Sequence, residues 1–195
     1  MTAITSLESF HKKGLFGDHH KKNESDLLKI SEVKDLIIIQ IVQFKKSAVK
    51  LENINIDGIK FPEISSSVNS NETTRILWSA PKTWLVVSKK KNIIQMIEKN
   101  CDAKDFAITD ISHSRAIIQI EGVEAIEVLK KGCPINFNEF RKNNCAGTIF
   151  QGINILIDMI DDRPEKFNVF ALRSFGESFY HDITDSALEF GYVGI

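Results

Sequence analysis

The sequence has few of the residues that usually mark a redox or metal site. It contains 3 cysteines in 195 residues and no CxxC pair, which argues against both a disulfide framework and a zinc site. Its 10 glycines never form the GxGxxG turn that cradles dinucleotide phosphates. His11, His19 and His20 lack a cysteine or carboxylate constellation at ligand spacing. We therefore expect no cofactor and no metal in this chain.

The sequence also lacks a strong net charge and a long apolar run. Lys and Arg total 25 and Asp and Glu total 26, so the formal charge is -1 and no global field favours nucleic acid or an anionic membrane. No apolar run reaches the roughly 20 residues that span a bilayer. Residues 1–22 contain no hydrophobic signal core. We expect a cytoplasmic protein with no nucleic-acid or membrane partner.

What the chain does have is enough apolar sequence, 43%, for one domain or for two small halves that share a core. Residues 1–30 are polar and show no lasting periodicity, so we expect an arm that is flexible or ordered only by a partner. Residues 31–195 are expected to form a single domain. The segments that read as strands are 35–44, 75–80, 83–88, 114–121, 145–150, 153–160 and 167–173. The segments that read as helices are a weak one after residue 44, then 92–100, a short one after Glu121, and 174–190.

The order of these expected elements repeats along the chain. A strand, a short helix, a hairpin and a helix in residues 31–110 recur in residues 111–195, although few residues are identical. We therefore predict an α+β fold made of two similar β-α-β-β-α-type halves packed together. Each half would carry its helices on one face of its sheet. Trp78 and Trp84, in the first hairpin, are interpreted as core aromatics.

Helix ends are marked most clearly in residues 105–134 and near the C-terminus. Gly132 is placed to adopt a left-handed cap, and Pro134 prevents the helix from continuing. Ser174 and Glu177 have the spacing of a capping box, which predicts the start of the last helix. The apolar stripe of that helix predicts a core or a subunit interface.

A polar cluster precedes the strand of residues 114–121. Asp110, Ser112, His113 and Arg115 have the composition of a nucleophile, base and acid, but adjacent strand residues alternate between faces and cannot easily converge. We expect Asp110 and Ser112 to satisfy backbone donors in a tight crossover. His113 and Arg115 would hold a turn, face a partner's carboxylates or contact a ligand.

From the first hairpin onward the chain resembles the gamma subunit of heterotetrameric sarcosine oxidase. The motifs that carry the resemblance are, in order, WSAPKTWL, TDISHSR, EGVEAIEVLKKGCPINF, CAGTI and RSFGESFYHDITDSALEFG. They cover roughly residues 75–191, and the N-terminal third matches only in the placement of its strand. Arg173, which opens the last motif, joins the four residues of the polar cluster as a candidate for ligand or interface contact.

The resemblance implies a fold like the amino-terminal part of the folate-dependent aminomethyltransferases, or T-proteins. It implies direct contact with the alpha subunit of the oxidase, with the beta and delta subunits in the same complex. That complex oxidises the N-methyl group of sarcosine to give glycine and hydrogen peroxide, and it can pass the one-carbon unit to tetrahydrofolate. FAD, FMN, NAD and tetrahydrofolate are then expected in the other subunits.

One departure from the T-protein pattern argues against chemistry in this chain. Those enzymes place a carboxylate directly after a glycine-rich hairpin, whereas FQGINILIDMI has one glycine, Gly152, and no acid before Asp158. We therefore expect a non-catalytic subunit without catalytic residues. Two alternatives stay open: a stand-alone folate-binding or aminomethyltransferase-like domain, and an α+β interaction module unrelated to either.

Overall fold

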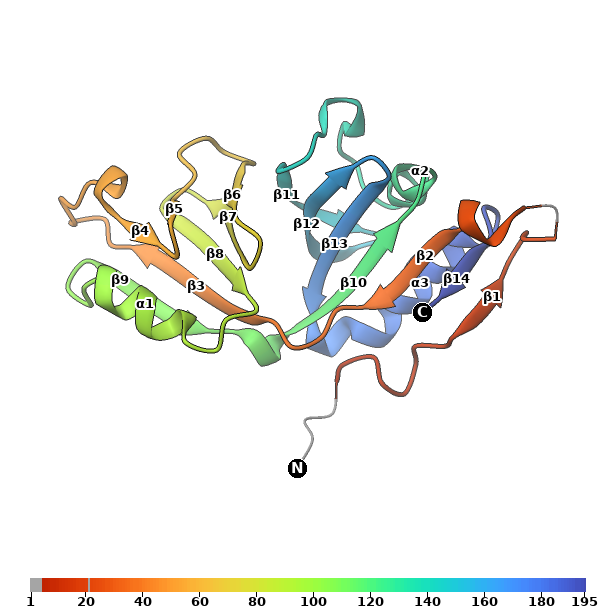
Figure 1. The fold of residues 1–195 in the computed structure, drawn as a ribbon, viewed down its shortest axis with the longest axis horizontal. Coiled ribbons are helices and arrows are strands. Elements are labelled where there is room, and N and C mark those ends of the chain that lie inside the picture. Colours follow the sequence, from red (N-terminus) through yellow and green to blue (C-terminus); the bar gives the residue numbers. More distant parts are fainter. Residues whose placement is uncertain (1–4, 21) are drawn as a thin grey trace. The chain divides into compact units, whose positions relative to one another are not determined.

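The computed structural model describes residues 5–20 and 22–195 and confirms an α+β fold. The chain divides into two compact units (Figure 1). Unit 1 takes in the N-terminal residues up to Lys34, together with Ser114–Lys142 and Gly147–Ile195. Unit 2 consists of Asp35–His113 and Asn143–Ala146. These boundaries differ from the expected halves 31–110 and 111–195, because unit 1 also recruits N-terminal residues that come before the first expected strand.

Unit 2 is organised around a five-stranded antiparallel sheet with the order β6-β7-β8-β3-β9. Its strands are β3 (Ile37–Gln43), β6 (Val68–Ser70), β7 (Thr74–Ala80), β8 (Thr83–Ser88) and β9 (Phe106–Asp110). A small two-stranded sheet, β4 (Asn55–Ile56) with β5 (Ile59–Lys60), joins it, and α1 (Ile93–Asn100) is its one α-helix within the part of the chain that the structure describes. Ile93 and Ile97 bury the apolar face of α1 in the same core as Trp84 and Val86. The predicted strand, hairpin and helix of this region are confirmed.

The weak helix expected after residue 44 does not form. The segment contains only a single 3-10 turn, η2 (Leu51–Asn53), before β4 begins. Gln43 donates from Nε2 to the carbonyl of Val49 at 2.8 Å, which holds the connection in an irregular path. Ile54, Ile56 and Ile59 then bury their side chains in the core of unit 2. Unit 2 therefore lacks the first helix of the predicted β-α-β-β-α order.

Unit 1 is organised around a seven-stranded sheet with the order β1-β14-β2-β10-β13-β12-β11. Its strands are β1 (Gly14–Phe16), β2 (Leu28–Glu32), β10 (Arg115–Glu121), β11 (Cys145–Phe150), β12 (Ile153–Asp162), β13 (Glu165–Leu172) and β14 (Tyr192–Gly194). The first two residues of β11, Cys145 and Ala146, count toward unit 2. Its helices are α2 (Ala125–Lys130) and α3 (Gly176–Ala187), with 3-10 turns η1 (Glu24–Asp26), η4 (Phe137–Glu139) and η5 (Arg173–Phe175). Val128 of α2 and Phe179 and Ile183 of α3 share one core with Ile118 of β10.

The N-terminal segment pairs within this chain, whereas we expected an arm that is flexible or ordered only by a partner. Strand β1 pairs with β14, and β2 lies in the sheet between β14 and β10. Leu7, Leu28 and Ile30 are buried in the core of unit 1, and the Glu32 carboxylate accepts from the backbone N–H of Leu7 at 3.0 Å. The partners of this segment are distant in sequence, so local periodicity could not find them. The prediction for residues 1–4 and 21 lies outside the described residues.

Two predicted helix ends are built differently from expectation. Gly132 does not adopt a positive φ; instead, a Cβ there would lie 2.8 Å from the Phe150 ring, so close packing explains the glycine. Helix α3 follows η5, and its N-cap residue Phe175 makes no side-chain capping bond, so the capping box predicted from Ser174 does not form. Within the described ranges, no helix is long and apolar enough to cross a membrane.

Candidate functional site

The polar cluster at the end of β9 is a tight turn rather than the start of a strand. Ser112–Ser114 form the 3-10 turn η3, so the strand alternation assumed for these residues does not apply. The Asp110 carboxylate accepts from the backbone N–H of Ser112 at 2.9 Å and from the Ser112 hydroxyl. The same hydroxyl oxygen accepts from the backbone N–H of Ile38 at 2.9 Å. The crossover role predicted for Asp110 and Ser112 is therefore confirmed.

Electrostatics agree with a structural role for Asp110. The hydrogen bond from the Ser112 hydroxyl, followed by that from the Ser112 backbone and the charge of His113, holds the pKa of Asp110 below its ordinary value. A carboxylate with a lowered pKa and local donors is a weak proton acceptor at neutral pH. It is poorly suited to the general-base role that its sequence neighbours suggest.

Of the other three predicted residues, one lies on η3 itself and two lie in unit 1. His113 is exposed on η3 in unit 2. Arg115 opens β10 in unit 1, opposite Leu172, so its position is next to that of Arg173 at the start of η5. Burial lowers the pKa of the Arg115 guanidinium from its ordinary value. Asp110, Ser112 and His113 thus lie in unit 2, and Arg115 and Arg173 lie in unit 1.

Asp158, the acid that follows the β11–β12 hairpin, is a buried residue of the sheet of unit 1. It lies within β12, directly across from Asn168 of β13, and its side chain has no exposed surface. Asn168 accepts in turn from Gln119 Nε2 of β10 at 2.9 Å. Asp158 is therefore part of a row of polar residues across the sheet rather than an exposed acid after a hairpin.

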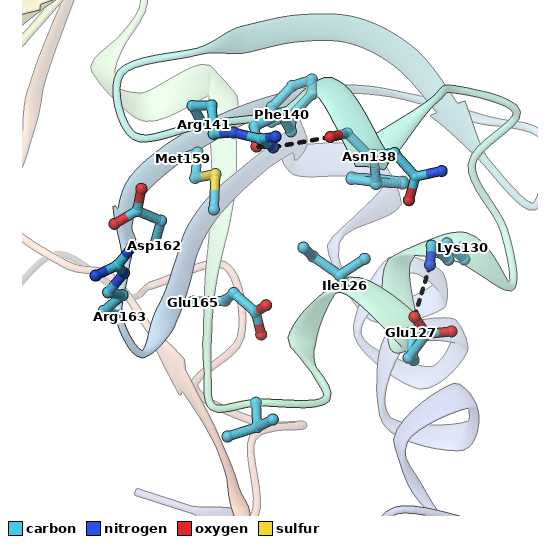
Figure 2. Close-up of a pocket in the computed structure, with 12 residues that line it drawn as sticks. Ile126, Glu127, Lys130, Asn138, Phe140, Arg141, Met159, Asp162, Arg163 and Glu165 are labelled. Atoms are coloured by element: carbon cyan, nitrogen blue, oxygen red, sulfur yellow. Dashed lines mark hydrogen bonds and ion pairs between the residues drawn. The ribbon is translucent and has the colours of Figure 1, made fainter.

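A pocket that the sequence did not reveal lies in unit 1, beside α2, η4 and the turn between β12 and β13 (Figure 2). Its volume is about 370 Å³, within the range typical of small-molecule sites. Its apolar lining consists of Val123, Ile126, Phe137, Phe140 and Met159. Its polar lining consists of Glu127, Lys130, Asn138, Arg141, Asp162, Arg163 and Glu165. Polar and charged residues therefore outnumber apolar ones in the lining, so the pocket suits a small polar or charged ligand with some carbon surface.

The pocket is held open by well-anchored turns. Phe137 of η4 is buried and meets Phe167 edge to face at 6.4 Å between ring centroids. The Asn136 side chain accepts from the backbone N–H of Asn138 at 3.1 Å and fixes the start of η4. The carbonyl of Glu165 accepts from the backbone N–H of Gly122 at 2.9 Å, which ties the first residue of β13 to the junction before α2. The walls are therefore set by core packing and backbone bonds.

The charged groups of the pocket differ in how many hydrogen bonds they make. Lys130 Nζ donates to Glu127 Oε1 at 2.6 Å. Arg141 Nη1 donates to the carbonyls of Asn138 at 2.8 Å and Phe140 at 2.7 Å. The Oε2 atom of Glu165 is buried and, among the described residues, has no hydrogen-bond partner. Burial, and then the negative charges of Glu124 and Glu127, raise the pKa of Glu165 above its ordinary value, against the opposing effect of Lys130.

Comparison with known proteins first defines the class of fold. No protein-family model matches the chain. Glycine cleavage system aminomethyltransferase T from Bartonella henselae superposes with a TM-score of 0.61 at 14% identity, over 86% of this chain and 48% of that protein. The chain thus has a fold found in about half of an aminomethyltransferase, as the sequence motifs predicted.

The particular similarity is to a sarcosine oxidase subunit. The chain is 25% identical over 137 residues to sarcosine oxidase subunit gamma from Corynebacterium sp. (strain U-96), which is 68% of this chain and 66% of that protein. A chain of heterotetrameric sarcosine oxidase from Corynebacterium sp. U-96, in complex with pyrrole 2-carboxylate, superposes with a TM-score of 0.78 at 21% identity, over 87% of both chains. The resemblance to the gamma subunit that the motifs indicated is confirmed.

Proposed function

We propose that this chain is the non-catalytic gamma subunit of a heterotetrameric sarcosine oxidase. The observation that carries the proposal is the similarity to sarcosine oxidase subunit gamma over 68% of the chain. In this role the chain supports the large alpha subunit, beside beta and delta subunits, in the cytoplasm. The complex oxidises sarcosine to glycine and hydrogen peroxide and forms 5,10-methylenetetrahydrofolate, with FAD, FMN, NAD and tetrahydrofolate held by the other subunits.

Three placements favour a supporting role over a catalytic one. Asp110 and Ser112 are engaged in hydrogen bonds that fix the crossover to β3. His113 is exposed on η3, where a partner chain could contact it. Asp158 is enclosed in the sheet, within β12 and opposite Asn168, rather than directly after the hairpin. These placements support hydrogen-bonding and partner-contact roles for these side chains.

Copurification tests the proposal. A tagged copy of this chain, coexpressed with untagged candidate alpha, beta and delta chains from the same source, is expected to retain all three through size-exclusion chromatography. The retained complex should consume sarcosine with formation of hydrogen peroxide, and the isolated chain should do neither this nor carry flavin absorbance. Recovery of the tagged chain alone, from cells that contain the other three chains in folded form, would contradict the proposal.

The fold shared with aminomethyltransferase T favours one second candidate, a folate-binding domain that acts alone. Titration calorimetry of the isolated chain with tetrahydrofolate separates the two. We expect no heat of binding. Saturable binding that is lost in both His113→Ala and Arg115→Ala, with Glu98→Gln as a control on the exposed surface of α1, would favour the second candidate instead.

A further inference from the structure

Glu165 differs from the other charged residues of the pocket described above, because its buried Oε2 atom has no hydrogen-bond partner among the described residues. A buried carboxylate oxygen without a donor is costly, and such groups normally indicate a missing partner. Figure 2 shows the carboxyl group pointing from β13 toward α2, across from Ile126 and Glu127. An ionised carboxylate offers about four acceptor positions, so Glu165 has unused capacity to accept hydrogen bonds inside the pocket.

The neighbouring cations do not supply the missing donor. Lys130 is engaged with Glu127, and Arg141 is engaged with two backbone carbonyls. The remaining acids near Glu165, namely Glu124, Glu127 and Asp162, add negative charge rather than donors. Arg163 follows Asp162 in the turn and lines the same pocket. The lining as a whole thus holds three cations and three acids, but the charges that act on Glu165 itself are two acids, Glu124 and Glu127, against one cation, Lys130. At that carboxylate the balance favours a positively charged donor.

The shape and chemistry of the walls decide which kind of cation fits. Small metal ions prefer several converging oxygen ligands, and among residues 5–20 and 22–195 no three His, Cys, Asp or Glu side chains are placed to hold one. The pocket instead offers carbon surface from the half-buried Ile126 and Phe140, with the buried Met159 behind them. An aromatic face such as that of Phe140 also attracts cations carried on an organic skeleton.

We infer that the pocket binds a small organic ammonium ion, which donates its N–H groups to Glu165 and packs its carbon skeleton against Phe140 and Ile126. The terminal torsion of a glutamate is broad and nearly two-fold, so rotation can present either carboxylate oxygen to the ligand. The about 370 Å³ of the pocket accommodates a monocyclic amine. The inference concerns unit 1 alone and does not depend on the proposed subunit role.

Methyl NMR of the full chain provides a direct test, because the sequence has only 3 methionines. Met159 lines the pocket, whereas Met96 lies on α1 in unit 2 and serves as an internal control. With [¹³C-methyl]methionine labelling, benzylammonium is expected to shift the Met159 signal saturably and to leave the Met96 signal in place. Absence of a Met159 shift, or a shift confined to Met96, would overturn the inference.

Benzyl alcohol, a neutral molecule of nearly the same shape, isolates the contribution of charge. The ammonium ion should bind at least about tenfold more tightly, as expected for a hydrogen bond to a charged partner. Glu165→Gln keeps the size of the side chain and should abolish this preference, while Glu98→Gln, on the exposed surface of α1, should preserve it. Equal binding of the two ligands, or an unchanged preference in Glu165→Gln, would contradict the assignment.

A measurement on the unmodified chain covers the case in which Glu165→Gln fails to fold. The carboxyl carbon of Glu165 can be titrated by NMR with and without benzylammonium. Because a bound cation stabilises the ionised carboxylate, the pKa of Glu165 should fall when the ligand is present. Binding should weaken as pH drops through the raised pKa of the free pocket. A titration curve unaffected by saturating ligand would exclude an ammonium–carboxylate contact.

Discussion

Asp110 and Glu165 are carboxylates in opposite situations. Asp110 accepts hydrogen bonds from the next turn, and its pKa is lowered. Glu165 has a buried oxygen without a partner, and its pKa is raised. Asp110 belongs to the motif that looked most chemical in the sequence, whereas Glu165 follows an unexceptional turn. The contrast shows that hydrogen-bond satisfaction, which the sequence does not display, separates a structural acid from a candidate ligand contact.

Asp57 extends the comparison to the best-satisfied acid of unit 2. Its carboxylate accepts from the Thr74 hydroxyl at 2.7 Å and from Asn71 Nδ2 at 3.2 Å, and it forms an ion pair with Lys90. The Asp57 side chain is only 8% exposed. Although burial alone would raise it, the hydrogen bond from Lys90 and those from Thr74 and Asn71 lower the pKa of Asp57 to about 2. The three acids therefore form a series, from fully satisfied to unsatisfied.

The largest effect is expected at Asp57. Asp57→Asn removes the negative charge that pairs with Lys90. It should lower the free energy of unfolding by about 2–3 kcal/mol, because breaking a partly buried charge pair leaves the charge of Lys90 uncompensated. Urea denaturation at pH 7 measures the change, with Glu98→Gln as the surface control. If Asp57→Asn lowered the free energy of unfolding no more than Glu98→Gln does, Asp57 would not be the stabilising acid that the comparison requires.

The pH dependence of the Asp57 contribution sharpens the same point. Because the folded-state pKa lies below the unfolded value, the contribution is complete above about pH 4. It is lost as pH falls toward the folded pKa of about 2. The difference in unfolding free energy between the wild type and Asp57→Asn should therefore stay constant from pH 7 to about pH 4 and shrink below it. A difference that varies between pH 5 and pH 7 would assign the stabilisation to another group.

A smaller loss is expected for Ser112→Ala. The substitution removes the donor to Asp110 and the acceptor for the backbone N–H of Ile38, which should cost about 1–2 kcal/mol of unfolding free energy. Since the Ser112 hydroxyl is the main cause of the lowered pKa of Asp110, that pKa should rise toward its ordinary value. A carboxyl titration by NMR that shows no rise would contradict the structural role of this bond.

These differences also mark how far sequence reasoning extends. Local patterns predicted β3, the β7–β8 hairpin, α1 and β10, because alternation, helical spacing and turn residues are properties of neighbouring positions. They missed β1 and β2, because the strands that pair with them, β14 and β10, come from far along the chain. The crossover role of Asp110 was accessible because its partners are two residues away.

The pocket could not be predicted for the same reason. Its walls come from α2, η4 and the β12–β13 turn, which only the fold brings together. Glu165 follows Asp161-Asp162-Arg163-Pro164, and the sequence gives no sign that one of its carboxylate oxygens is buried. A lone acid at the head of an apolar strand is a weak signal, since most such residues are solvated.

The smallest effect, and one of opposite sign, is expected at Glu165. Because its folded-state pKa is raised, the ionised carboxylate disfavours the folded state at pH 7, and this penalty disappears as pH falls and the folded state takes up the proton first. Glu165→Gln should therefore leave unfolding free energy unchanged or raise it by up to about 0.5 kcal/mol at pH 7, the effect being limited by solvent screening. The gain should vanish at low pH. A marked destabilisation at pH 7, measured by urea denaturation beside Glu98→Gln, would show that Glu165 is a satisfied structural acid like Asp57, and the contrast between the two carboxylates would be lost.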